Sequence, residues 1–272
     1  MRQALEASRM ATDDESKQEE ILRKVALELS KVRFDSVPPE IAHVVHSVVR
    51  EVSGNEDPYS ELKKKYNQIA MEMYPDLKRR VEKSEDRLLT AAKIAIAGNI
   101  IDFGPGHFFD LNETIEETLR MDLAVNHFDK FKSELEKSNT IYYLGDNAGE
   151  IVFDRILLEE LGDRQFVYVV KGGPIINDAT EKDAKFAGIN KIAKIEKVSS
   201  GALGTGPERN SKEFVDILKS ADLVISKGQG NYESLSEADA NIFFMFRAKC
   251  PVLAKDAGVD VGSTVIMKTS EK

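Results

Sequence analysis

Several residue types are scarce in this sequence, and each scarcity excludes a class of protein. The single cysteine among 272 residues, Cys250, can form neither an internal disulfide nor a cysteine-rich zinc site. No apolar run approaches the roughly 18 residues of a membrane-spanning helix. The first residues, "MRQALEASRMATDDESKQEE", lack the apolar core of a signal peptide. We therefore expect a soluble cytoplasmic protein that does not bind membranes.

Positive charge is also in deficit. The chain has 38 lysines and arginines against 47 aspartates and glutamates, a net charge of −9. A general nucleic-acid binder needs a basic face that displaces counterions, so we expect no nucleic-acid partner. A small anionic ligand would need a local cation, because the overall field of the protein repels it.

The periodicity of apolar residues changes near the middle of the chain. Up to about residue 135 the pattern is helical. The stretch "EDRLLTAAKIAIAGNIIDFG" is nearly continuous in apolar residues up to Ala97 and predicts a buried helix that ends at Gly98 or Asn99. After this, helical patterns separate short runs typical of strands: "TIYYLG", "RQFVYVVKG", "KIAKIEKVS", "ADLVISKG", "NIFFMFRAKC" and "STVIMK". This alternation predicts an α/β fold, a three-layer α/β/α Rossmann-like unit with a mostly parallel sheet over residues 136–272. Residues 1–135 are expected to form an all-helical N-terminal subdomain.

The first four predicted strands of this half are each followed by an unusual polar loop. The loops are "GDNAGE" (145–150), "KGGPIINDAT" (171–180), "SSGALGTG" (199–206) and "KGQGNYE" (227–233). Because the carboxyl ends of parallel strands open onto one edge of a sheet, and ligands bind at that edge, we expect an active site there.

Asp146, Asn147 and Asp178 are the candidate metal ligands and catalytic residues. Two carboxylates and a carboxamide suit a hard divalent cation, whereas without a cation the two carboxylates would repel each other. The alternative interpretation is that Asp146 and Asn147 only cap the following helix. Glu150 is a candidate contact to the substrate or the metal, or simply an acid in the first turn of a helix.

The loop Lys227, Gly228, Gln229, Gly230 and Asn231 is the candidate phosphate-binding element. Its glycines permit close approach of the backbone, Lys227 offers a positive charge, and Asn231 offers a directional donor. A tight turn with Lys227 in solvent is the alternative. The loop is not a Walker A motif, since no Gly-Lys-Ser/Thr occurs in the chain.

Three further residues are candidates for substrate contact. Asn99 and Asp102, in "AGNIIDFG", follow the buried helix and would reach a substrate if the helical part covers the edge of the sheet. Lys255, in "VLAKDAG", offers another cation. Each also has an ordinary structural explanation, as a helix cap, a surface turn or a solvated lysine.

The motifs "AGNIIDFG", "GDNAGE", "GGPIINDAT" and "KGQGNYE", in this order, resemble the metal-dependent damage-control phosphatases, a former family of unknown function that includes proteins proposed as carboxyl methyltransferases. The resemblance spans roughly residues 91–250 and is strongest to the compact archaeal and bacterial branch. It implies a divalent ion (Mg, Mn, Co or Ni) on Asp146, Asn147 and Asp178, with the Lys227 loop on the substrate phosphate. Many relatives carry an N-terminal Cys-x-x-Cys pair. This chain begins "MRQALEAS", so we expect that pair to be absent unless the natural start lies upstream.

The predicted function is metal-dependent hydrolysis of small phosphomonoesters, such as sugar phosphates or related damaged phosphometabolites. Whether Asp146 also acts as a covalent nucleophile stays open, although Asn147 and Ala148 depart from the Asp-x-Asp pattern of haloacid-dehalogenase enzymes. Two alternatives remain at this point. One is an S-adenosylmethionine-dependent carboxyl methyltransferase, and the other is a non-catalytic protein that binds a phosphorylated metabolite.

Overall fold

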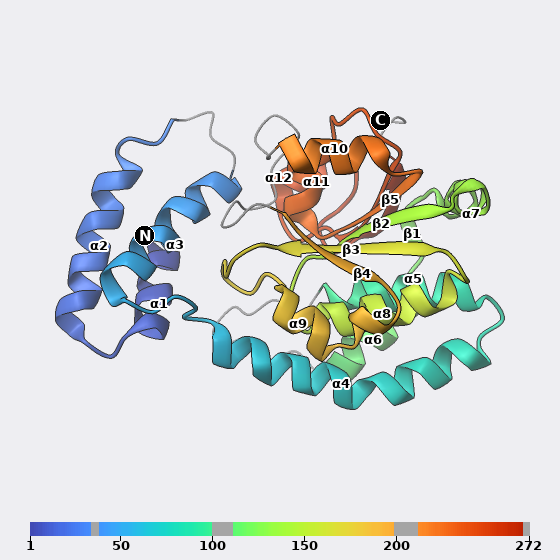
Figure 1. Ribbon diagram of the computed structural model, residues 1–272, viewed down its shortest axis with the longest axis horizontal. Helices are drawn as coiled ribbons and strands as arrows, with labels where there is room; N and C mark the ends of the chain where they lie inside the picture. The colour runs from blue at the N-terminus through green and yellow to red at the C-terminus, as the bar shows by residue number, and fades with distance from the viewer. Residues whose placement is uncertain (34–37, 100–110, 199–211, 269–272) are drawn as a thin grey trace.

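The three N-terminal helices pack on one another beside the rest of the molecule (Figure 1). The structure is a computed structural model that describes residues 1–33, 38–99, 111–198 and 212–268. The first helices are α1 (Arg2–Ala11), α2 (Glu15–Leu29) and α3 (Pro38–Ser53). Their small apolar cluster also contacts Leu62 and Ile176, and Arg50 donates a hydrogen bond to the carbonyl of Pro174 at 2.8 Å. These three helices therefore lie against the loop that follows the third strand.

Four further helices precede the α/β half of the chain or join it. They are α4 (Ser60–Lys83), α5 (Arg87–Gly98), α6 (Leu111–Arg120) and α7 (Phe128–Lys137). Helix α4 is one continuous helix of 24 residues, although it contains Pro75. The predicted buried helix is confirmed as α5, which is capped by Asp86 and ends at Gly98.

The sheet has seven strands in the order β1-β7-β6-β5-β2-β3-β4. All neighbouring pairs are parallel except β6 and β7. The predicted α/β class with a mostly parallel sheet is therefore confirmed. The strands are β1 (Leu123–Asn126), β2 (Thr140–Leu144), β3 (Gln165–Lys171), β4 (Lys194–Val198), β5 (Leu223–Lys227), β6 (Ile242–Arg247) and β7 (Thr264–Lys268).

The sequence predicted that residues 1–135 are all-helical, but this part of the chain also contains a strand. Strand β1 belongs to this part of the chain and pairs with β7, near the C-terminus. Helices α4 to α7 contribute side chains to the same apolar core as the sheet. The reason is that α5 is apolar almost all round, so it must be buried, and the sheet supplies the surface that buries it. The predicted boundary at residue 135 does not coincide with a change in packing.

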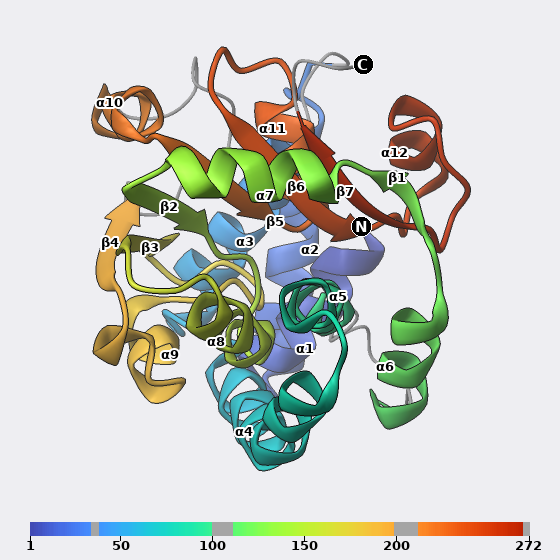
Figure 2. The ribbon, with the colours of Figure 1, turned by 90° about the vertical axis from the view of Figure 1, so that its right-hand side faces the viewer.

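Helices cover both faces of the sheet (Figures 1 and 2). One face packs against α5, α8 (Glu150–Glu160) and α9 (Glu181–Phe186), with α4 outside α5 and α8. The other face packs against α10 (Lys212–Ser220), α11 (Gln229–Leu235) and α12 (Pro251–Asp256). Side chains of a strand alternate between the faces, so Tyr143, Tyr168 and Ile225, which are register partners, all point to the α5/α8 side. Within the described residues, no helix is long and apolar enough to cross a membrane.

Candidate active site

Two of the predicted polar loops pair with each other at the carboxyl ends of β2 and β3. The N–H of Ala179 donates to the carbonyl of Asp146 at 2.8 Å, and the N–H of Ala148 donates to the carbonyl of Asn177 at the same distance. Between these bonds, Asn147 and Asp178 form an antiparallel bridge. The backbone therefore brings together the three residues that the sequence nominated as metal ligands.

Asp146 and Asp178 are buried carboxyl groups with raised pKa values. Burial, followed by the charges of Glu150 and Asp178, raises the pKa of Asp146 well above its ordinary value. Burial raises the pKa of Asp178 to about 6, with Glu150 adding to the rise while Lys171 and Lys63 oppose it. Neither aspartate forms an ion pair with another described residue within 4.0 Å, and Oδ2 of Asp178 is buried without a hydrogen-bond partner. An unpartnered carboxylate oxygen beside a second carboxylate is an arrangement that a cation would stabilise.

The chemistry of the donor set fits a hard divalent cation. Carboxylate and carboxamide oxygens are the ligands that Mg²⁺ and Mn²⁺ prefer. No group of three or more His, Cys, Asp or Glu side chains suited to a metal occurs in the described part of the chain. A site here would therefore depend on Asn147 as well as the two aspartates, and on water or substrate oxygens for its remaining positions.

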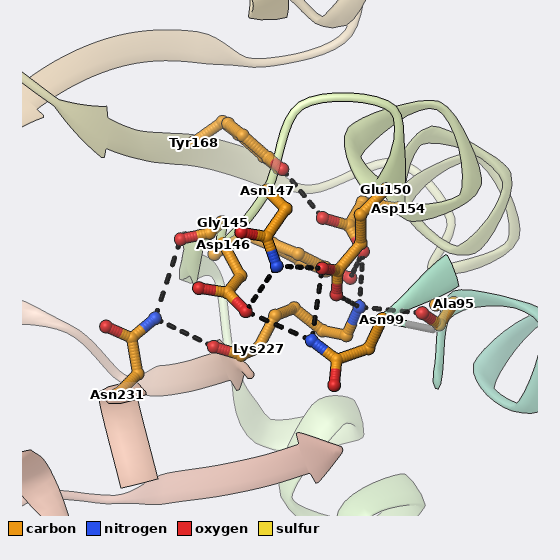
Figure 3. Close-up of polar contacts among 11 residues, drawn as sticks. Ala95, Asn99, Gly145, Asp146, Asn147, Glu150, Asp154, Tyr168, Lys227 and Asn231 are labelled. Carbon is orange, nitrogen blue, oxygen red and sulfur yellow. Dashed lines mark hydrogen bonds and ion pairs between the residues drawn. The ribbon is translucent and has the colours of Figure 1, made fainter. Parts of the chain in front are cut away.

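These residues adjoin a buried charged cluster through the contact of Asn147 with Glu150 (Figure 3). We call it the Lys227 cluster, and it consists of Glu150, Asp154, Lys227, Tyr143 and Tyr168. The Lys227 ammonium donates to Glu150 Oε1 and to Asp154 Oδ1, each at 2.7 Å, and to the carbonyl of Ala95 at 2.8 Å. The two tyrosine hydroxyls donate to the two oxygens of Asp154 at 2.8 and 2.7 Å.

The cluster holds its charges in place. Burial alone would lower the pKa of Lys227, but the carboxylates of Asp154 and Glu150 outweigh it and raise that pKa above its ordinary value. Burial, with Asp154 next, raises the pKa values of Tyr143 and Tyr168, so both hydroxyls remain protonated donors. The cluster therefore keeps a positive charge on Lys227 in a fixed position next to Glu150, which contacts Asn147 in the loop after β2.

Comparison with known proteins places the chain in a family. The model of the damage-control phosphatase ARMT1-like domain matches residues 1–265. The chain belongs to this family. A protein from Methanocaldococcus jannaschii described as uncharacterized is 41% identical over 98% of this chain and 92% of its own length. Damage-control phosphatases from Pyrococcus horikoshii and Archaeoglobus fulgidus are 35% and 36% identical, over 97% and 95% of this chain and 93% and 92% of their own.

The fold of this damage-control phosphatase family member also matches a solved structure. The crystal structure of a DUF89 family protein from Pyrococcus horikoshii has a TM-score of 0.89 and is 33% identical, covering 99% of this chain and 95% of that one. The family resemblance seen in the four sequence motifs is thus confirmed. The relatives support a phosphatase function.

The geometry contradicts the prediction that Lys227 contacts a phosphate directly. An ammonium has three donors, and all three are taken by acceptors inside the protein, with the side chain wholly buried. The side chains of the same loop also make internal bonds: Asn231 donates to the carbonyl of Lys227 at 2.8 Å, and Gln229 accepts from the N–H of Lys249 at 2.8 Å. Phosphate binding by the backbone of this loop remains a prediction.

Gly228 leaves room for the Asp146 carboxylate. It has a φ of +80°, and a Cβ atom there would lie 1.9 Å from Asp146 Oδ2. The glycine is therefore needed both for the backbone conformation and for the space that the carboxylate occupies. Gly230 has no such role, because a Cβ atom there would meet nothing within 4 Å.

The remaining predicted contacts fall in different places. Asn99 lies in the site: its Nδ2 donates to Asp146 Oδ2 at 3.0 Å and to Glu150 Oε2 at 3.2 Å (Figure 3). Glu150 is wholly buried and both of its carboxylate oxygens accept hydrogen bonds from donors inside the protein, so the structure does not expose it to a substrate. Lys255 lies on α12 with an exposed side chain. Asp102 and the loop 199–206 lie outside the described residues.

Sequence reasoning missed three lysines around the aspartates. The charges of Lys171 and Lys249 act on Asp146, and those of Lys171 and Lys63 act on Asp178. Lys171 ends β3 and is only 8% exposed, while Lys63, a buried residue of α4, forms an ion pair with the partly exposed Asp57 at 2.7 Å. Lys171 was inside a quoted motif, but nothing local distinguished it from a solvated lysine.

Asn67 was missed as well, and it braces the site from α4. Its Oδ1 accepts from the N–H of Gly149 at 2.6 Å, and its Nδ2 donates to Asp183 Oδ1 at 2.8 Å. Asp183 in turn completes a capping box with Thr180. One buried carboxamide thus joins the loops that follow β2 and β3. Asp154 had a local signal, since it lies four residues after Glu150 on the same face of helix α8, with only apolar residues between the two.

Proposed function

We propose that the protein is a metal-dependent phosphatase that hydrolyses small phosphomonoesters, with a phosphorylated sugar or related damaged metabolite as substrate. The observation that carries the proposal is the pairing of the Asp146–Asn147 and Asp178 segments, with two buried carboxylates of raised pKa, neither of which forms an ion pair within 4.0 Å with another described residue. Membership of the damage-control phosphatase family supports the reaction class.

Asp146, Asn147 and Asp178 would hold one divalent ion, Mg²⁺, Mn²⁺, Co²⁺ or Ni²⁺. When bound, such an ion neutralises phosphoryl oxygens and orients the attacking group. A phosphate monoester carries about −1.5 to −2 charges near neutral pH, so an acidic protein needs local cations to attract it. Lys171 and Lys249 act on Asp146 from beside the site, and we assign them the task of attracting the phosphate. Lys227 is wholly buried, and its ammonium pairs with the Glu150 carboxylate rather than with the substrate.

The proposal is tested by phosphate release from a panel of phosphorylated sugars, nucleotides and phosphopantetheine with each of the four metals. The wild type should release phosphate only when a metal is present, and Asp146→Asn and Asp178→Asn should lose this activity. The exposed Asp163 supplies the matched control, since Asp163→Asn should behave as the wild type.

Three outcomes would overturn the proposal in different ways. Undiminished phosphate release in EDTA would remove the metal from the reaction. Tight binding of a phosphometabolite without release under any condition would favour a non-catalytic binding protein. Saturable binding of S-adenosylmethionine, with methyl transfer to a carboxylate and no phosphate release, would favour the methyltransferase.

A further inference from the structure

Every hydrogen bond that the structure gives to the Glu150 carboxylate comes from a donor inside the protein. Its Oε1 accepts from the Lys227 ammonium at 2.7 Å. Its Oε2 accepts from the carboxamide nitrogens of Asn99 and Asn147, each at 3.2 Å (Figure 3). The side chain is wholly buried at the first position of α8. Glu150 therefore meets the candidate metal ligand Asn147 without being open to a ligand itself.

A carboxamide has two nearly equal ends, and only one of them can ligate a cation. Asn147 Nδ2 is held by Glu150 Oε2 and by Asp146 Oδ2, the latter at 2.9 Å. When a bound cation keeps Asp146 ionised, reversing the amide would place its oxygen against those two carboxylate oxygens, three acceptors without a proton between them. Asn99 is held in the same way, and its Oδ1 is buried with no hydrogen-bond partner among the described residues. In Figure 3 the oxygen of each carboxamide points away from Glu150.

We propose that Glu150 is a positioning residue that fixes the amide orientation of Asn147 and Asn99, so that their oxygens are presented to the cation and substrate. Lys227 keeps the second oxygen of Glu150 engaged and is itself held by Asp154 and the carbonyl of Ala95. The inference rests on the proposed function, because it assigns Asn147 to a metal.

The role requires an acceptor at both ends of the side chain, and this makes Glu150→Gln a sharp test. Glutamine has the same shape but one accepting and one donating end. If its oxygen faces Lys227, its NH₂ group meets the NH₂ groups of the two asparagines. If the oxygen faces the asparagines, the NH₂ group meets the ammonium. Either orientation places two donors against each other. Reversing the Asn147 amide would remove the conflict between the NH₂ groups, but it would then direct the Asn147 nitrogen, not its oxygen, toward the cation.

Mn²⁺ binding measured by titration calorimetry, together with phosphate release, tests the inference. Partners of this kind typically cost about 10- to 100-fold in metal affinity or activity when they are removed, so Glu150→Gln should weaken Mn²⁺ binding by roughly this factor. Glu160→Gln is the matched control. Glu160 is on the same helix, its side chain is 7% exposed, and it pairs with Lys78 and Arg87, so the substitution weakens ion pairs of a poorly exposed carboxylate without touching an asparagine. It should bind Mn²⁺ as the wild type does.

The variant Asn147→Asp supplies an independent readout that does not depend on the folding of Glu150→Gln. An aspartate is ordinarily the stronger ligand for a hard cation, yet here it would face the Glu150 and Asp146 carboxylates without a proton to share. We expect weaker Mn²⁺ binding for Asn147→Asp. Adding Glu150→Gln, whose NH₂ group can donate to the new aspartate, should recover part of the loss.

Equal Mn²⁺ affinity in the wild type and Glu150→Gln would overturn the inference alone. Unchanged or tighter binding by Asn147→Asp in the Glu150 background would do the same. A wild type that binds no divalent cation would overturn the proposed function, and this inference with it. A wild type that binds Mn²⁺ without releasing phosphate would overturn the phosphatase reaction and leave the inference to be judged on affinity.

Discussion

Asp178→Asn should make the metal-free protein more stable above pH 6. Asp178 is 8% exposed, and burial is the largest cause that raises its pKa from 3.8 to about 6. Because the folded state keeps this proton to a higher pH than the unfolded chain does, the free energy of unfolding falls as pH rises from about 4 to about 6. A difference of roughly 2 pKa units corresponds to about 3 kcal/mol at pH 7 and above. Asparagine has the same shape and never carries that charge.

Urea unfolding in EDTA at pH 4 and pH 8 measures this effect. The variant should exceed the wild type by about 3 kcal/mol at pH 8 and by less than about 1 kcal/mol at pH 4. Asp163→Asn, which replaces an exposed aspartate, should change neither value. A variant that is less stable than the wild type at pH 8, or whose advantage is the same at both pH values, would refute the reasoning.

The same pair of proteins links the buried charge to the metal. Saturation of the wild type with Mn²⁺ at about 100 times its dissociation constant should raise its stability by about 2.7 kcal/mol. Asp178→Asn lacks a proposed ligand and should gain little. The stability gap between the two proteins should therefore nearly close when Mn²⁺ replaces EDTA. A gap that is unchanged by Mn²⁺ would separate Asp178 from the metal.

Two further substitutions test individual positions. Gly228→Ala should abolish phosphate release and lower stability by at least about 1–2 kcal/mol, because its φ is +80° and its Cβ would lie 1.9 Å from Asp146 Oδ2, whereas Gly230→Ala should be tolerated. Lys249→Met removes a positive charge that acts on Asp146, so in steady-state assays it should raise KM and the inhibition constant for inorganic phosphate by about tenfold (~1.4 kcal/mol). Lys255→Met, which replaces an exposed lysine, should leave both constants unchanged. Equal effects at the two glycines, or at the two lysines, would contradict these assignments.

Much of the fold could be predicted because local patterns carry it. The six apolar runs became β2 to β7, and the apolar helix before Gly98 became α5. Strand β1 escaped prediction for a physical reason. It is a four-residue edge strand with alternating partly exposed and exposed positions, and its partner β7 lies about 140 residues further along the chain, so the pairing leaves no local trace.

The candidate site divides in the same way. The sequence placed Asp146, Asn147 and Asp178 at the ends of neighbouring strands, and the two loops do pair. It could not show what covers each face. Lys227 lies four residues after Leu223 and two after Ile225, so all three point to one side of β5, and the period of two gives that much.

The amino-acid sequence by itself determined the α/β class, the polar loops at the strand ends and the family, because these depend on spacing along the chain. Only the tertiary structure decided the roles within the site. Helices α5 and α8 cover the face to which Lys227 points, so its ammonium is enclosed with Glu150 and Asp154 and does not face a ligand. Burial and charge depend on neighbours that are distant in sequence, and those neighbours turn a predicted phosphate ligand into a buried counter-ion.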